Sequence, residues 1–156
     1  MKLLQPLFDT SQKQSKYILY AFLVSIIPAF VLSYGIDLLF PDTQFPEFEP
    51  NFTYLLVSVV ILGPLIETLL MWPIIAVLSR ISTSTMFISI FSAILWAMLH
   101  SSLYLIWGLT IFWSFVVFSI SFTVWRKISI KKAIFITFSI HALQNAVASI
   151  FILIEG

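Results

Sequence analysis

The chain has 156 residues, of which 60% are hydrophobic and only 10% are charged, with a mean hydropathy of +1.06. Soluble domains carry about 25% charged residues, and a domain of this length leaves roughly a third of its unfolded surface exposed, so this composition excludes a soluble enzyme. A net charge of +1 gives no bulk attraction to nucleic acid, and the lack of cysteine excludes disulfides and a cysteine nucleophile. The composition predicts an integral membrane protein.

Five apolar segments are long enough to cross a bilayer, whose hydrocarbon core of about 30 Å takes roughly 20 helical residues. In chain order they are predicted at residues 17–40, 54–79, 86–107, 109–125 and 133–154. The first is too long for the apolar core of a signal peptide, and we expect a retained anchor. The third and fourth are nearly continuous, and we place the turn between them at Gly108. The fold class predicted is all-α, a polytopic membrane helix bundle with about five transmembrane helices.

The placement of the few charges gives an orientation. With five crossings and a cytoplasmic N-terminus, all the basic residues fall inside, as the positive-inside rule requires, and the C-terminus lies outside. These eight are Lys2, Lys13, Lys16, Arg80, Arg126, Lys127, Lys131 and Lys132. The acidic residues that fall outside are Asp42, Glu47, Glu49 and Glu155. Residues 1–16 form either a short interfacial segment or a frayed terminus.

Four polar residues stand out within the apolar segments. Glu67 lies in the middle of the second segment, and the chain's two histidines, His100 and His141, lie in the third and fifth. Asn145 follows His141 by four residues, so both project from one helical face. A charged group at this depth costs roughly 2.5–3.5 kcal/mol, and the shared depth allows all four to meet in one cavity. Independent packing and interhelical hydrogen bonding are the alternative for each residue.

Two chemistries fit such a set. A carboxylate removed from water is a good general base, and a neutral histidine with an asparagine can donate hydrogen bonds to an oxyanion, which together indicate amide hydrolysis without a cofactor. The alternative is zinc held by Glu67, His100 and His141, a ligand set of the thermolysin type. That alternative needs a further general base, and the spans contain no second deep carboxylate.

The order of these residues resembles the CPBP family, the CAAX proteases and bacteriocin-processing enzymes also called Abi. That family carries E-E-x-x-x-R, F-x-x-x-H and H-x-x-x-N or H-x-x-x-D on separate membrane helices. The corresponding segments here are residues 67–72 (ETLLMW), 96–100 (WAMLH) and 141–145 (HALQN). The resemblance covers roughly residues 55–152. It divides the chain into residues 1–53, with the N-terminal segment, first anchor and acidic loop, and residues 54–156, a CPBP-like four-helix membrane domain.

The resemblance implies a glutamate-type intramembrane protease that requires no metal. Glu67 would activate water, His141 and Asn145 would stabilise the oxyanion, and His100 would position water or substrate. The first motif departs from the family pattern, because Thr68 stands where the second glutamate is usual and Trp72 where the arginine is usual.

Three functions follow from these observations. The first is an intramembrane endopeptidase acting on a hydrophobic or lipidated peptide within the lipid bilayer. The second is a catalytically weak or inactive CPBP-like protein that serves in bacteriocin immunity or as a binding or scaffold component, as the altered first motif suggests. The third, a small proton-coupled transporter, lacks the inverted repeats of transporter architecture. The expected location is the bacterial cytoplasmic membrane.

Overall fold

The structure is a computed structural model that describes residues 2–44 and 46–155. Its elements are helical throughout, and no strand occurs in these two ranges. In chain order they are the 3₁₀-helix η1 (Lys2–Phe8), α1 (Gln14–Leu39), α2 (Phe52–Tyr54), the π-helix η2 (Leu55–Leu62), α3 (Gly63–Ile81), α4 (Thr85–Ser101), α5 (Trp107–Trp125) and α6 (Ile130–Glu155). The segments α2, η2 and α3 follow one another directly and form one rod of 30 residues.

Four of these helical segments are long and apolar enough to cross a membrane: α1, the α2–η2–α3 rod, α5 and α6. The fifth long helix, α4, is apolar but has only 17 residues, at the short end of the range for a transmembrane helix. The all-helical fold class and the integral membrane protein predicted from composition are therefore confirmed.

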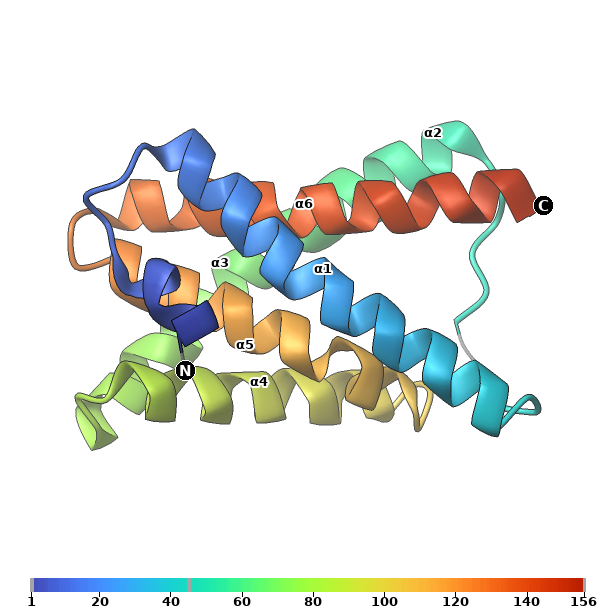
Figure 1. Cartoon of the computed structure of the whole chain (residues 1–156), viewed down its shortest axis with the longest axis horizontal. Helices are drawn as coiled ribbons and strands as arrows, with labels where there is room; N and C mark the ends of the chain where they lie inside the picture. Colours follow the sequence, from blue (N-terminus) through green and yellow to red (C-terminus); the bar gives the residue numbers. More distant parts are fainter. Residues whose placement is uncertain (1, 45, 156) are drawn as a thin grey trace.

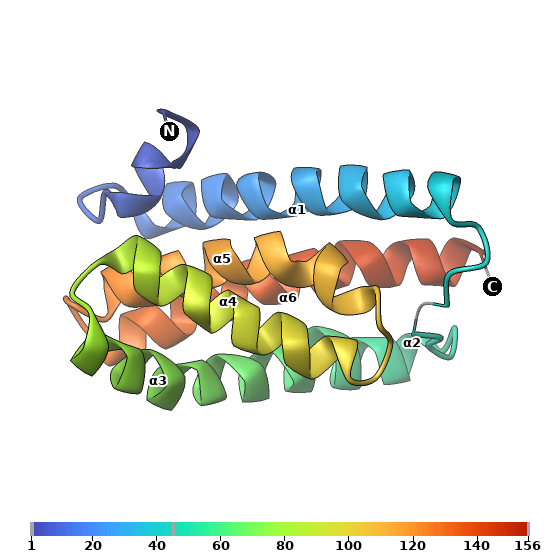
Figure 2. The same cartoon turned by 90° about the horizontal axis from the view of Figure 1, so that it is seen from below.

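Helix α5 lies at the centre of the bundle. In Figure 1, α1 crosses over α5 and α6, and in Figure 2, α1 and α3 lie on opposite sides of that central pair. Within the most apolar window of α5, 72% of the residues are buried, against 22% in α1. Large apolar side chains such as Val31, Val77 and Ile154 point outward on the surrounding helices. This is the surface that a bilayer would cover.

The helix ends gather at two opposite ends of the bundle. Figure 2 shows the start of α1, the α3–α4 connection and the α5–α6 connection at one end, where the basic residues of the sequence occur. At that end the Arg126 guanidinium donates a hydrogen bond to the hydroxyl of Ser79 and ties α5 to α3. The end of α1, the α4–α5 connection and the end of α6 lie at the opposite end.

The N-terminal segment is packed against the bundle. Leu7 is fully buried, and the Tyr17 hydroxyl lies 2.9 Å from the Leu7 carbonyl oxygen and 3.1 Å from the Ser121 hydroxyl. The hydroxyl therefore joins η1 to α1 and α5. Of the two alternatives for residues 1–16, the frayed one does not describe residues 2–8.

The predicted turn at Gly108 is wrong. Helix α4 ends at Ser101, and Gly108 is the second residue of α5. A Cβ atom at Gly108 would overlap the carbonyl oxygen of Ala97 and the hydroxyl of Ser101, so the glycine lets α4 and α5 approach closely. The prediction failed because a small residue serves a close helix contact as readily as it serves a turn. The third predicted segment, residues 86–107, consequently ends too late.

Candidate functional site

A cavity of about 190 Å³ lies among the η2–α3 rod, α4, α5 and α6. All four residues singled out from the sequence line it. Its lining is Phe48, Val59, Glu67, His100, Trp107, Ile111, Ser114, Phe115, Phe118, His141, Gln144, Asn145, Ala148 and Ile152. Most of this wall is aliphatic or aromatic, so the few polar groups face one another across apolar surroundings.

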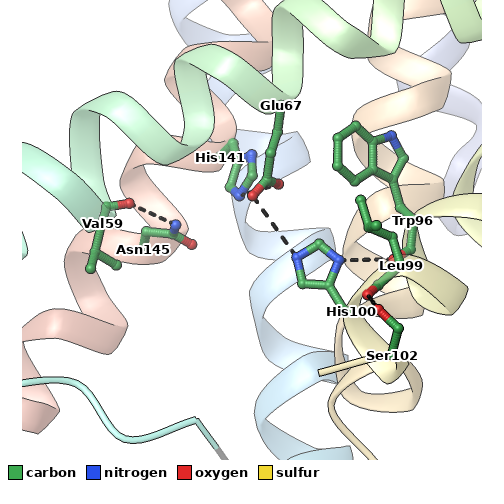
Figure 3. Close-up of polar contacts among 8 residues, drawn as sticks. All are labelled: Val59, Glu67, Trp96, Leu99, His100, Ser102, His141 and Asn145. Carbon is green, nitrogen blue, oxygen red and sulfur yellow. Dashed lines mark hydrogen bonds and ion pairs between the residues drawn. The ribbon is translucent and has the colours of Figure 1, made fainter. Parts of the chain in front are cut away.

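Glu67 lies between the two histidines. Its Oε1 is 3.9 Å from Nε2 of His100, and its Oε2 is 3.8 Å from Nε2 of His141, as Figure 3 shows. Both distances exceed a direct hydrogen bond, which for N–H···O falls at 2.7–3.2 Å, and both are short enough for a small polar molecule to bridge. Three helices thus bring one carboxylate and two imidazoles to a single point.

His100 is held in one tautomer by its own helix. Its Nδ1 is 2.8 Å from the carbonyl oxygen of Trp96, an acceptor only, so Nδ1 carries a proton and donates. In the neutral ring Nε2 is then an acceptor, and this atom faces Glu67. The ring packs edge-on against Trp107, with ring centroids 4.5 Å apart. His100 is therefore oriented to accept a proton or a hydrogen bond at the Glu67 side.

His141 is buried and stacked. Its ring lies nearly parallel to Phe118, with centroids 4.6 Å apart, and edge-on to Phe115. Among the described residues, its Nδ1 has no hydrogen-bond partner, and the same is true of Oε2 of Glu67. Stacking fixes the plane of the imidazole, and its Nε2 faces the Glu67 carboxylate in the cavity.

Asn145 is oriented by a backbone carbonyl. Its Nδ2 donates to the carbonyl oxygen of Val59, 2.9 Å away, and Figure 3 shows the amide turned toward Val59 rather than toward Glu67. One amide hydrogen and the amide oxygen remain for other partners. The sequence predicted that Asn145 and His141 share one face of a helix. In the structure both residues line the same cavity, and Asn145 lies on the side next to η2.

The Val59 carbonyl is free because of the π-helix and the proline that follows it. In η2 each N–H bonds the carbonyl five residues earlier, as Gly63 does with Ser58. The next donor in that pattern would be residue 64, which would bond Val59, but Pro64 has no N–H. The interrupted ladder leaves an acceptor that the Asn145 side chain takes up.

Gln144 is a lining residue that the sequence analysis missed. Its Oε1 accepts from the Ser25 hydroxyl at 2.6 Å, and its Nε2 donates to the Ser114 hydroxyl at 2.7 Å. It therefore connects α6 with α1 and α5 at the cavity wall. A signal was available, because Gln144 follows His141 by three residues and so projects from the same face of an apolar helix.

The two positions that depart from the family pattern lie in different surroundings. Thr68 is fully buried, and Trp72, one turn later, is 46% exposed on the outer surface of α3. Neither position carries a charge that would need a partner within the bundle.

The described residues do not form the ligand set that the zinc alternative requires. Zinc binds nitrogen and oxygen ligands at about 2.0–2.2 Å in tetrahedral sites. Across residues 2–44 and 46–155, no three histidine, aspartate or glutamate side chains are arranged to hold a metal ion. Zinc therefore stays a prediction, which metal analysis of the purified protein tests.

No family model, curated protein or solved structure matches the chain.

Proposed function

We propose that the protein is an intramembrane endopeptidase that hydrolyses a peptide bond of a hydrophobic peptide with water activated by Glu67. The observation that carries the proposal is the position of the Glu67 carboxylate, within 4 Å of Nε2 of both His100 and His141 at one cavity. The order of the motifs, which resembles the CPBP family, supports the same chemistry.

The reaction proceeds by general-base catalysis. A water molecule between Glu67 and His100 gives a proton to the Glu67 carboxylate, and its oxygen forms a bond to the carbonyl carbon of the substrate. The remaining amide hydrogen of Asn145 and an N–H of His141 donate to the oxyanion. Glu67 then returns the proton to the amide nitrogen as the C–N bond breaks and the carbonyl re-forms, which yields a carboxylic acid and an amine.

The membrane arrangement proposed has five crossings, with α4 as the shortest, a cytoplasmic N-terminus and an outer C-terminus. The gathering of the basic segments at one end of the bundle supports this orientation. We place the protein in a bacterial cytoplasmic membrane, where its substrate reaches the cavity through the lipid.

The proposal is tested with the purified full chain in liposomes and a library of capped apolar peptides. Mass spectrometry of the products in ¹⁸O-labelled water is expected to show one cleaved peptide bond and one ¹⁸O in the new carboxylate. His141→Ala and Asn145→Ala are expected to slow cleavage by about 10²–10³-fold each, the effect of losing an oxyanion donor. Cleavage that both variants leave unchanged would refute the assignment.

Replacing Pro64 by alanine tests how Asn145 is positioned. The Pro64→Ala variant regains an N–H that competes with Asn145 for the Val59 carbonyl. We expect kcat/KM to fall about tenfold, because one hydrogen bond contributes about 0.5–1.5 kcal/mol. The measurement is the rate of peptide hydrolysis, together with the thermal midpoint to show that the fold persists.

Pro73→Ala, in the same helix but exposed, is the matched control and is expected to keep wild-type activity. Equal activity of the two variants would contradict the role of Pro64.

A second candidate function is binding without turnover, as in an immunity or scaffold protein. The outward-facing Trp72, which stands where the family pattern has an arginine, is the observation that favours it. The Glu67→Gln variant separates the two functions in cells. A biological effect that survives this substitution requires binding only, whereas an effect that disappears supports the peptidase.

A further inference from the structure

A second cavity, of about 290 Å³, adjoins the Glu67 cavity on the side of α1. Helix α1 contributes Ile26, Ala29 and Phe30 to its wall. Six residues line both cavities: Phe48, Trp107, Ile111, Gln144, Ala148 and Ile152. The two cavities therefore share a wall built mainly from α5 and α6.

The second cavity has room for a large apolar group. A dry cavity of about 150 Å³ lined by leucine, isoleucine and phenylalanine is enough to bind benzene, and this one is larger. Its wall is mainly aliphatic and aromatic, and none of the described residues that line it is charged. An aromatic or branched aliphatic group fits this chemistry, and a charged group does not.

Gln144 lies at the junction and favours a peptide over a lipid chain. Its amide already meets the Ser25 and Ser114 hydroxyls, but one N–H of its nitrogen and one lone pair of its oxygen remain. A peptide backbone that crosses the junction supplies an N–H and a carbonyl to match these groups. An alkyl chain would leave both unpaired, which costs free energy in apolar surroundings.

We propose that the cavity walled by α1 is a specificity subsite, which holds a bulky apolar side chain of the peptide next to the bond presented to Glu67. This inference rests on the proposed peptidase function. It assigns substrate selection to α1, a helix outside the region of family resemblance, and it assigns to Gln144 the recognition of the peptide backbone.

Photolabelling of the full-length Glu67→Gln variant in detergent micelles tests the subsite without turnover. The probe is a capped alanine pentapeptide with a central p-benzoylphenylalanine. Mass spectrometry is expected to find the label within residues 26–33 or 148–152. A competing pentapeptide with central phenylalanine is expected to suppress labelling at about tenfold lower concentration than the all-alanine peptide, since only the former buries a ring.

Two variants change the volume of the subsite. Ala29→Phe, made in the Glu67→Gln protein, fills the cavity and is expected to reduce labelling about tenfold. The matched control, Val31→Phe, adds the same ring to a position 69% exposed on the outer side of α1 and is expected to label normally. Ile26→Ala enlarges the cavity and is expected to shift preference from a phenylalanine competitor toward a tryptophan competitor, which keeps the test decisive if Ala29→Phe fails to fold.

Three results would overturn the subsite: no labelling, equal labelling of Ala29→Phe and Val31→Phe, or labelling of the same residues by a diazirine phospholipid that the phenylalanine peptide does not displace. Failure of the proposed peptidase function can be distinguished from failure of the subsite. Labelling as expected, with no hydrolysis by the wild-type chain, leaves a peptide-binding site without an enzyme. Hydrolysis that depends on Glu67, with labelling unaffected by Ala29→Phe, overturns the subsite alone.

Discussion

Replacing Glu67 by glutamine is expected to lower the rate of peptide hydrolysis by about 10²–10⁴-fold, the contribution typical of a general base. Glutamine keeps the size of the side chain but cannot accept the proton of water. The fold is expected to persist, because removing a charge that lies within the bundle removes a desolvation cost. Initial rates with a quenched fluorescent peptide and the thermal midpoint in detergent measure the two effects.

A second carboxylate supplies the control. Glu49 lies in the connection between α1 and α2 and is exposed, so Glu49→Gln is expected to keep wild-type activity. Glu67→Asp keeps the charge but shortens the side chain by one methylene, which withdraws the carboxylate from both histidines, and an intermediate rate is expected. If Glu67→Gln retained more than about half of the wild-type rate, the catalysis would have to come from another group.

The largest structural effect is expected at Gly108. In Gly108→Ala the added Cβ would overlap the Ala97 carbonyl oxygen, so α4 and α5 must separate. Overpacking of this kind typically costs about 1–3 kcal/mol, which lowers the thermal midpoint by several degrees in a chain of this size. Separation of the two helices also moves His100 and Trp107, which lie beside the contact, and a loss of activity is expected as well.

Gly35→Ala is the matched control for this prediction. Gly35 is also within a helix, α1, but an added Cβ there meets no atom within 4 Å. The variant is expected to be as stable as the wild type or slightly more so, because alanine is the better helix former. Similar midpoints for Gly108→Ala and Gly35→Ala would show that the α4–α5 contact is not tight.

The fold could be predicted where hydrophobic length alone decides it. Four of the predicted segments agree with observed helices to within three residues at each end: residues 17–40, 54–79, 109–125 and 133–154. The prediction failed between α4 and α5, where the connection contains Leu103, Leu105 and Ile106. Because the turn is as apolar as the helices beside it, hydropathy does not mark where α4 ends.

The ionisable side chains of the candidate site could be predicted from the sequence, but the backbone group that orients Asn145 could not. Glu67, His100 and His141 were identifiable because such groups are costly in a membrane, and they do line one cavity. The Val59 carbonyl that orients Asn145 depends on the π-helical register of η2, which no side-chain pattern reveals. Pro64 was the one clue, since a proline within an apolar helix frees a carbonyl one turn earlier.

Cross-linking within the membrane tests whether Glu67 and both histidines share one cavity. The chain has no native cysteine, so pairs are introduced without background: Glu67→Cys with His141→Cys, and Glu67→Cys with His100→Cys. Ser92→Cys with Ser119→Cys is the positive control, because those hydroxyl oxygens lie 3.0 Å apart. Glu67→Cys with Val31→Cys is the negative control, because their helices, α3 and α1, lie on opposite sides of the bundle.

Short bifunctional thiol reagents are added to membranes that contain the double-cysteine variants. Each chain is then cut once between its two cysteines, and a gel shows whether the two fragments remain joined. A disulfide requires Cα atoms within about 7 Å, so the reagents extend the reach to the width of the cavity. The structure predicts that both Glu67 pairs link, together with the Ser92–Ser119 pair, while the Val31 pair does not. Linking of the Ser92–Ser119 pair without either Glu67 pair would contradict the shared cavity and with it the proposed catalysis.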